Sequence, residues 1–414
     1  MSPAPIPSAR ELLKERDYLF FWASRWMGGL GVQVQSVAMG WQVYDLSRKT
    51  MDVGHASFNV SLIGLITFAP LFFLALPAGA MADRYDRKRI LIICYAAELL
   101  PSAVLAASGI FHFASVPLLL SVALLFGTSR AFFSPAMTAL GPMLVPRELL
   151  PRAIAWNSLA GQLSSILGSA LGGLLSGVSL AAPYEVAFAL YLGAILAIAA
   201  LRGHTTPQTQ PGSRWELVKE GLAYVWTNKI VFGAISLDLA AVILGGATAL
   251  LPAFARDVLH VGSSGFGLLR ASQTVGAAGV AFILAARPIR TQAGLKMFAG
   301  VAVFAAATVV FGLSRSLWLS VAALAVIGAA DMMSVYVRQT LVQLVTPDAM
   351  RGRVAAVSTL FISASNELGE FRGGLVARFI GPVSAVVYGG LGALVVTGLW
   401  ARLFPALRTA DRLE

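Results

Sequence analysis

Ionisable residues inside apolar stretches are the residues of this chain best suited to chemistry. The stretch 363–374 is the most polar of these, and Glu367 and Glu370 lie three positions apart in it, so a helix would place them on one face. Two carboxylates together in a low dielectric repel each other, and one of them should therefore hold a proton near neutral pH. The alternative is a structural network with Arg372 and a neighbouring helix.

Further charged residues lie deep in apolar stretches, where burying an ion is costly. Asp238 and Asp331 are additional candidates for binding protons, and Glu98 and Arg130 are candidates for binding a solute. The alternative is that such a residue forms an ion pair with a neighbouring side chain that serves only the structure. Arg338 lies nearer the end of its stretch, so we expect its guanidinium to reach toward the interface.

Residue sets typical of enzymes are absent from the sequence. There is no Ser/His/Asp set, no H-E-x-x-H and no P-loop, and the 4 His have no metal-ligand spacing. The single cysteine, Cys94, excludes an internal disulfide. We therefore expect no enzyme, no catalytic residue, no metal site and no cofactor.

The composition indicates an integral membrane protein. Hydrophobic residues make up 57% of the chain and charged residues 12%, and the mean hydropathy is +0.76. Soluble domains carry about 25% charged residues, so lipid is the solvent that this composition requires. The net charge of +11 does not indicate nucleic-acid binding, because the basic residues fall in short loops between apolar stretches.

The apolar stretches predict an all-α fold of twelve membrane-spanning helices, since a span needs roughly 20 residues. Most Lys and Arg fall in loops on one side, which predicts that both termini are cytoplasmic. The expected spans are 18–43, 57–78, 90–110, 116–140, 153–177, 183–201, 229–252, 264–286, 294–313, 317–340, 354–378 and 383–404.

The one long interior connection divides the chain into a six-helix bundle at 1–201, a cytoplasmic linker with an amphipathic helix at 202–228, and a second six-helix bundle at 229–414. The bundles repeat in sequence: a single offset of 201 relates Pro146 to Pro347 and Arg130 to Asp331. Parallel halves of this kind are a known transporter construction, with a substrate site near the midplane.

The loop between the second and third spans carries a basic motif, Gly79-Ala-Met-Ala-Asp-Arg-Tyr-Asp-Arg-Lys. It resembles G-x-x-x-D-R-x-G-R-R/K of the major facilitator superfamily, and Asp86 stands where that family usually has Gly. The resemblance implies that this loop latches the cytoplasmic faces of the two halves. The residues that match the motif and would form the latch are Gly79, Asp83, Arg84, Arg87 and Lys88. The alternative is a solvated basic loop.

The stretch 153–177 is similar to the antiporter motif of the same superfamily, g-x-x-x-G-P-x-x-G-G. Gly168, Gly172 and Gly173 match it, and Ser169 replaces the Pro. In such a motif the glycines allow close helix contact and bending. Small residues at this spacing are also common in other membrane helices.

Short segments further resemble the enterobactin-exporter-like branch of the superfamily: Asn366 to Phe371, Trp41 to Ser47 and Gly221 to Trp226. This resemblance implies a proton-driven exporter of a siderophore, drug or other small molecule in a bacterial inner membrane. It would be a monomer that binds protons, a solute and lipid, but no nucleic acid, with the proton gradient as its driving force. The residues proposed to line its cavity, beside Glu98 and Arg130, are Gln33, Gln35, Phe132, Phe133 and Tyr336.

Two alternatives remain at this point. One is a facilitator or proton-coupled importer of a small organic solute, which keeps transport but changes its direction or coupling. The other is a membrane receptor or scaffold that uses the fold to bind a partner without transporting anything.

Overall fold

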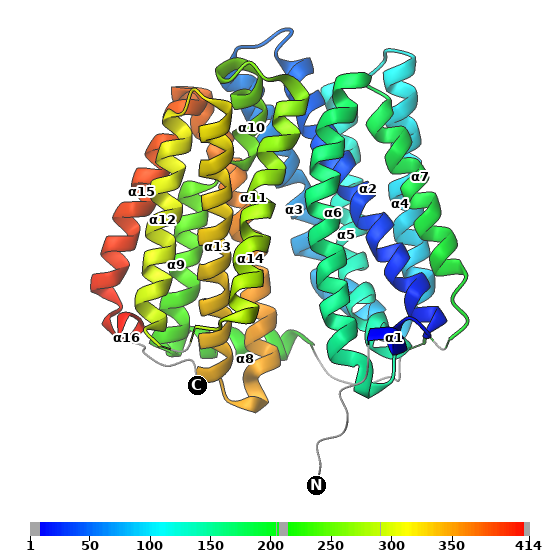
Figure 1. The fold of residues 1–414 in the computed structure, drawn as a ribbon, viewed down its shortest axis with the longest axis vertical. Helices are drawn as coiled ribbons and strands as arrows, with labels where there is room; N and C mark the ends of the chain where they lie inside the picture. Colours follow the sequence, from blue (N-terminus) through cyan, green and yellow to red (C-terminus); the bar gives the residue numbers. More distant parts are fainter. Residues whose placement is uncertain (1–8, 204, 207–213, 290, 410–414) are drawn as a thin grey trace. The chain divides into compact units, whose positions relative to one another are not determined.

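The computed structural model describes residues 9–203, 205–206, 214–289 and 291–409, and in this part of the chain the regular structure is helical throughout (Figure 1). The breaker-rich start of the predicted linker, at 204–213, lies largely outside the described residues. The helices that precede the linker are α1 (Ala9–Leu12), α2 (Arg16–Ser47), α3 (Val53–Arg84), α4 (Arg87–Ile110), α5 (Val116–Leu140), η1 (Gly141–Leu144), η2 (Arg147–Leu149), α6 (Leu150–Val178) and α7 (Ala182–Ala199).

The second half of the chain continues this pattern, with one interrupted span. Its elements are α8 (Arg214–Thr227), α9 (Lys229–Gly245), η3 (Thr248–Leu250), α10 (Leu251–Ala253), η4 (Phe254–Val258), α11 (Gly262–Ala286), α12 (Ala293–Leu313), α13 (Leu317–Val345), α14 (Asp348–Ile380), α15 (Pro382–Leu403) and α16 (Pro405–Arg408). Among the described residues, 10 helical segments are long and apolar enough to cross a membrane.

The two remaining predicted spans correspond to α2 and α14, which have 32 and 33 residues. Both exceed the roughly 20 residues that a span requires, but both are less apolar than the other long helices. The structure therefore confirms a multi-pass helical membrane protein. The total of twelve spans and the location of the termini stay predictions.

Each predicted span falls on a helix, but the span expected at 229–252 is interrupted. The α-helix α9 ends at Gly245, and Gly246 forms its C-cap in an extended conformation. The chain then continues through η3 and α10 into η4, a short π-helix. Gly pairs and Pro are common causes of such breaks, and Gly245, Gly246 and Pro252 supply them here.

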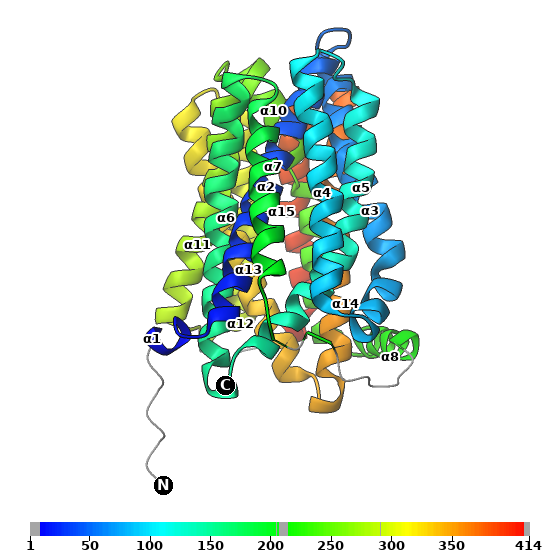
Figure 2. The ribbon, with the colours of Figure 1, turned by 90° about the vertical axis from the view of Figure 1, so that its right-hand side faces the viewer.

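The described chain forms two compact units. The first contains Met1–Met39 and Ala69–Gly212, and the second contains Gly40–Phe68 and Ser213–Glu414. In the first unit α4 packs between α5 and α7 (Figure 2), around a buried cluster that includes Tyr95 and Tyr191. In the second unit α13 packs against α11 and α12, and α9 packs against α14 and α15.

The linker helix α8 belongs to the second unit, where it packs against α14 and α9. Tyr224 donates a hydrogen bond from its hydroxyl to the carbonyl of Val345 at 2.9 Å, and Arg353 forms an ion pair with Glu220. The end of α2 and the first half of α3 also cluster with this unit. The predicted bounds of the two bundles stay a prediction.

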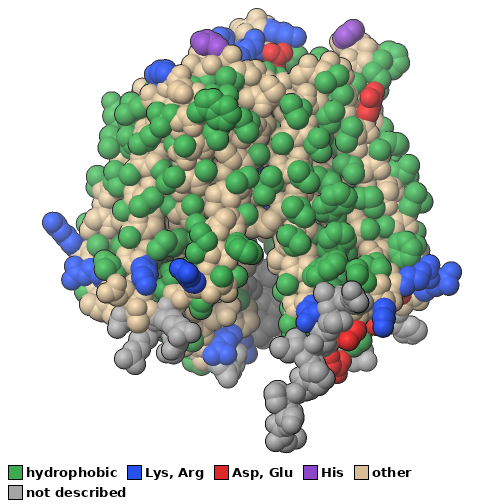
Figure 3. All heavy atoms as spheres, in the orientation of Figure 1, with side chains coloured by type: hydrophobic (Ala, Val, Ile, Leu, Met, Phe, Trp, Pro, Cys, Tyr) green, Lys and Arg blue, Asp and Glu red, His purple; other side chains and the backbone are tan. Residues whose placement is uncertain are grey.

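The surface matches a lipid environment. Large apolar side chains project from the flanks of the helices, and Phe73, Ile93 and Phe282 are 75%, 67% and 79% exposed. Figure 3 shows hydrophobic side chains covering the helix flanks, whereas Lys and Arg gather near the helix ends. In water such a surface would aggregate, so it is a surface for hydrocarbon.

Glycines bring two helix pairs into close contact, and the two pairs are related by the sequence repeat. In the first unit a Cβ added to Gly168 of α6 would lie 3.1 Å from the Leu30 carbonyl of α2. In the second unit a Cβ at Gly369 of α14 would lie 2.7 Å from the Val242 carbonyl of α9. Gly168 and Gly369 are separated by the same offset of 201 that the sequence predicted.

The next glycine along each helix repeats the contact. A Cβ at Gly172 would lie 2.8 Å from the Val34 carbonyl, and one at Gly373 would lie 3.1 Å from the Gly246 carbonyl. Glycine permits this because it presents no side chain to the facing backbone. Ser169, which replaces the Pro of the motif, leaves α6 as one continuous helix.

We expect Gly168→Val to lower the free energy of unfolding by about 1–3 kcal/mol, as overpacking does in tightly packed sites. The added Cβ would stand 2.6 Å from the Gln33 Cβ of α2. Gly161→Val in the same helix is the matched control, because a Cβ there meets nothing within 4 Å. Thermal unfolding of the purified variants in detergent measures the difference. Equal unfolding temperatures for the two variants would contradict this account of the α2–α6 contact.

Candidate functional site

A buried group of charges joins α9 and α13 in the second unit. Arg338 of α13 lies with its guanidinium 3.3 Å from a carboxylate oxygen of Asp238 of α9, and the side chains are 1% and 7% exposed. Asp331 lies seven positions before Arg338, two turns along the same face of α13. It interacts electrostatically with both Asp238 and Arg338. We call Asp238, Arg338 and Asp331 the charge cluster.

The charge cluster corrects the sequence-based expectation for Arg338. Instead of reaching toward the interface, its guanidinium is almost completely buried, because Asp238 of the neighbouring helix offers a closer counter-ion. One arginine and two carboxylates carry a net charge of −1 when both carboxylates are ionised. Such a charge is costly in a buried site, and binding one proton removes it.

Glu367 and Glu370 lie together, as their spacing predicted, on the side of α14 that faces α3. A Cβ added to Gly64 of α3 would lie 3.0 Å from the Glu367 Oε2 and 3.6 Å from the Glu370 Oε2. The two carboxylates thus share a position against a glycine of the second unit. Their roles as proton-binding groups stay predictions.

Arg372, the partner of these glutamates in the structural alternative, contacts the interrupted helix. Its Nη1 donates to the carbonyls of Ile243, at 3.1 Å, and Leu244. These carbonyls lie in the last turn of α9, where the break at Gly245 leaves acceptors without intrahelical donors. The Arg372 guanidinium therefore supplies hydrogen-bond donors to carbonyls at the end of α9, within an apolar stretch.

The basic motif at 79–90, expected as a loop, lies mostly in helix: it comprises the end of α3, the connection at 85–86 and the start of α4, and it stabilises helix ends within the first unit. Asp86 is the N-cap of α4 and accepts a hydrogen bond from the Lys88 backbone amide at 3.0 Å. Lys88 donates from Nζ to the carbonyls of Ala199 and Leu201, both at 2.7 Å, at the end of α7. Arg87 donates to the Ala139 carbonyl at 3.3 Å.

The geometry at Asp86 also explains why Asp can replace the usual Gly. Its φ is −58°, so the position does not require the left-handed conformation that favours glycine. A carboxylate there gains the hydrogen bonds of an N-cap, including one from the Thr205 hydroxyl at 2.5 Å. The latch between halves, with Asp83 and Arg84, stays a prediction.

Most residues proposed to line a cavity pack within one unit. Gln33 donates to the Ser165 hydroxyl at 2.8 Å between α2 and α6. Phe133 packs edge-on against Tyr95, with ring centroids 5.1 Å apart. Phe132 packs on the same core, and Tyr336 packs on a core of the second unit. Arg130 is exposed on α5, whereas Glu98 and Gln35 are buried.

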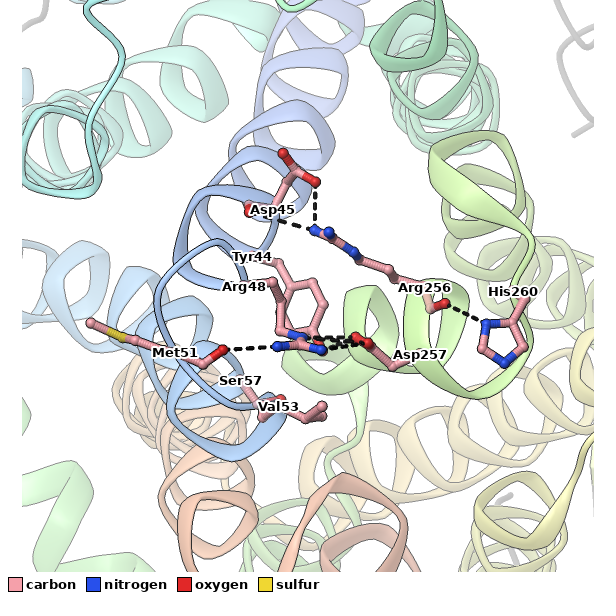
Figure 4. A network of polar contacts seen from close by, with 9 residues as sticks. All are labelled: Tyr44, Asp45, Arg48, Met51, Val53, Ser57, Arg256, Asp257 and His260. Carbon is pink, nitrogen blue, oxygen red and sulfur yellow. Dashed lines mark hydrogen bonds and ion pairs between the residues drawn. The ribbon is translucent and has the colours of Figure 1, made fainter.

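A network of charges between the end of α2 and η4 escaped the sequence analysis. Figure 4 shows Tyr44, Asp45 and Arg48 directed toward Arg256 and Asp257. Asp257 accepts hydrogen bonds from the Tyr44 hydroxyl at 2.5 Å and from Arg48 Nη2 at 3.0 Å. Arg256 donates to Asp45 at 2.5 Å. We call these five residues the α2–η4 network.

The network is crossed, since each segment supplies one acid and one arginine. Tyr44 and Arg48 are four positions apart, so the end of α2 directs both to the same side. The hydrogen bond to Asp257 raises the pKa of Arg48 above its ordinary value, which keeps its charge. The signal available in the sequence was an acid near each arginine: Asp45 lies three positions before Arg48, and Asp257 directly follows Arg256.

These features define a multi-pass helical membrane protein, and comparison with known proteins identifies its family. Residues 9–413 match the model of the family described as "Transmembrane secretion effector". The chain belongs to this family of major facilitator superfamily transporters, and it is a transporter rather than an enzyme.

Curated relatives and solved structures agree with this assignment. The chain is 27% identical over 362 residues to the enterobactin exporter EntS of Citrobacter koseri, covering 86% of this chain and 85% of the relative. The EntS of Escherichia coli O1:K1 / APEC is 26% identical over the same coverage. These relatives confirm the resemblance to the enterobactin-exporter-like branch.

Two solved transporters share the fold. A POT family transporter in complex with 5-aminolevulinic acid has a TM-score of 0.74 at 10% identity, covering 95% of this chain and 96% of its own. A bacterial homologue of the human lysosomal transporter Spinster has a TM-score of 0.66 at 15% identity, with the same coverage. At these identities the likeness concerns the fold alone.

We expect Arg338→Gln to lower the free energy of unfolding by about 3–5 kcal/mol, because it leaves Asp238 buried without its counter-ion. Adding Asp238→Asn should restore most of the lost stability, since the double variant buries no uncompensated charge. Arg402→Gln at an exposed position of α15 is the control. Thermal unfolding measures five proteins: the wild type, the single variants Arg338→Gln and Asp238→Asn, the double variant and the control. Additive losses in the double variant would mean that the two side chains are not coupled.

For the α2–η4 network we expect a coupling energy of about 1 kcal/mol between Arg48 and Asp257, because the pair is partly exposed. A double-mutant cycle of Arg48→Ala and Asp257→Ala measures it, and high salt should reduce it. Lys49→Ala, next to Arg48 and exposed, should change stability little. A coupling of zero at low salt would show that the crossed pairs add nothing to stability.

Proposed function

We propose that this protein is a proton-coupled efflux transporter of a bacterial inner membrane, with both termini in the cytoplasm. It would exchange protons for a small organic molecule by alternating access, through movement of 1–201 against 229–414. The exporter relatives support the direction, and the basic loops support the orientation. The relatives named enterobactin exporters favour a siderophore or a drug-like molecule as the solute.

The charge cluster is the observation that carries this proposal. Asp238 is held by Arg338 at 3.3 Å, so it keeps its counter-ion in either protonation state of the cluster. Asp331 lies two turns from Arg338 along α13 and is only half-buried, and it would therefore be the group that takes up and releases the proton. When Asp331 is protonated the cluster is neutral, and when it is ionised the cluster is negative.

A change of charge inside an apolar unit can drive a conformational change, because the two states of the transporter solvate the cluster differently. In an exporter the protonated state would favour return to the inward-facing form, where the proton leaves and the solute binds. Glu367 and Glu370 are the second pair of candidates for the same role. Gly64 on the facing helix leaves room for both carboxylates.

The alternatives from the sequence have less support. A facilitator needs no titratable cluster in the second unit, and an importer reverses the direction suggested by the exporter relatives. A receptor or scaffold would not need two copies of the same glycine-mediated helix contact for any motion. The following experiment distinguishes all of them.

In everted membrane vesicles with an acidic interior, addition of a transported solute should release protons, seen as recovery of a quenched fluorescent dye. The panel contains catecholate siderophores, lipophilic cations and organic acids. Asp331→Asn should abolish the response, because the cluster then has no proton to exchange. Asp52→Asn, an exposed carboxylate beyond the end of α2, is the matched control and should respond like the wild type.

Glu367→Gln and Glu370→Gln are tested in parallel. Loss of the response in these variants, with Asp331→Asn active, would move the proton site from the charge cluster to α14. A response with the opposite sign would indicate an importer. No response to any compound, with expression and folding verified, would contradict proton antiport and favour a facilitator or a receptor.

A further inference from the structure

The first unit has a buried acidic residue of its own, Glu98, which is separate from the charge cluster of the second unit. Glu98 stands in the middle of α4 and is 4% exposed. The helices α5 and α7 pack against α4, and α2 reaches it through the Tyr95 hydroxyl, which donates to the Ser24 carbonyl at 3.0 Å. Glu98 is therefore enclosed by protein on three sides and does not line an open surface.

The polar contacts of Glu98 differ in kind from those of Asp238. The Ser129 hydroxyl of α5 lies 3.0 Å from the Glu98 Oε1, where it donates a hydrogen bond. A serine hydroxyl both donates and accepts, so it can bond to an ionised carboxylate or accept from a protonated one. A guanidinium, which only donates, stabilises only the ionised form. The Glu98 site thus accommodates both protonation states without moving a helix.

A second polar group extends this site toward α2. The Ser102 hydroxyl, one turn beyond Glu98 on α4, donates to the Gln35 Oε1 at 2.6 Å. Two buried polar atoms of this set have no hydrogen-bond partner among the described residues, the Glu98 Oε2 and the Gln35 Nε2. An acceptor and a donor are therefore left unsatisfied in one buried, mostly uncharged environment, where polar groups are normally paired.

The other titratable groups around Glu98 are few. Arg130 follows Ser129 on α5 and is exposed, Tyr191 faces Glu98 from α7, and Cys94 and Tyr95 precede it on α4. Arg25 of α2 interacts with Tyr95 and donates to the Asn157 carbonyl at 3.4 Å. Among these groups Arg130, from its exposed position, favours the ionised carboxylate, whereas the phenols and the thiol beside Glu98 favour a bound proton.

We propose that Glu98 is a second proton-binding site, located in the first unit and loaded independently of the charge cluster. Ser129 positions the carboxyl group, and Ser102 positions Gln35 beside it. The inference rests on the proposed proton-coupled function and extends it, because it gives each half of the transporter its own titratable group. Transport would then move protons through two sites rather than one.

Infrared spectroscopy of the purified full-length protein in lipid tests this directly, since a protonated carboxyl group has its own carbonyl-stretch band. The wild-type band should lose area as the pH rises, and Glu98→Gln should remove one component of it. Ser129→Ala should shift that component to higher frequency, because the acid loses a hydrogen-bond partner. Asp331→Asn should leave the component in place and remove a different one.

The outcomes are distinguishable from those for the charge cluster. Unchanged spectra in Glu98→Gln at every pH would overturn the proposal, and so would a Glu98 component that does not change with pH. A titrating Glu98 component in a protein that fails the vesicle assay would support this site while contradicting antiport. If Glu98→Gln does not fold, the Ser129→Ala shift alone decides, and its absence would overturn the proposal.

Discussion

The cost of a charge in hydrocarbon is the constraint on which the rest of this structure depends. A membrane helix can carry an ion only if the protein itself provides the compensation. Three solutions occur here: an ion pair at Arg338 and Asp238, helix carbonyls at Arg372, and a serine hydroxyl at Glu98. Each solution fixes which helices must touch. The few charged and polar side chains inside the helices therefore determine much of how the apolar helices pack.

Local properties made most of the fold predictable. A span is recognised from the length of its apolar stretch, which needs no knowledge of its neighbours, and the range predicted at 116–140 coincides with α5. The break after Gly245 was not predicted, because a Gly pair is also tolerated within continuous helices. What decides between the two is the support that Arg372 gives to the carbonyls, and that contact spans 129 residues of sequence.

The candidate site was predictable in its members but not in its pairings. Asp238 and Asp331 stand out because acids are rare in apolar stretches, but Arg338 was assigned to the interface, since its position along its helix said nothing of Asp238 on another. The α2–η4 network was missed for a related reason. Its residues lie at helix ends, where a charge normally reaches water, and only the fold brings Arg48 to Asp257.

The glycine contacts that recur at Gly168 and Gly369 have a consequence for how this protein tolerates substitution. A shared offset in sequence, together with the same kind of backbone contact in space, makes the α2–α6 and α9–α14 pairs an internal repeat. Glycine occurs in both pairs, because any side chain there would push the helices apart. The buried acids do not recur at this offset, since Val37 is the counterpart of Asp238 and Ala299 that of Glu98. Close packing thus restricts these glycine positions to one residue type, whereas the positions of buried charge differ between the two units.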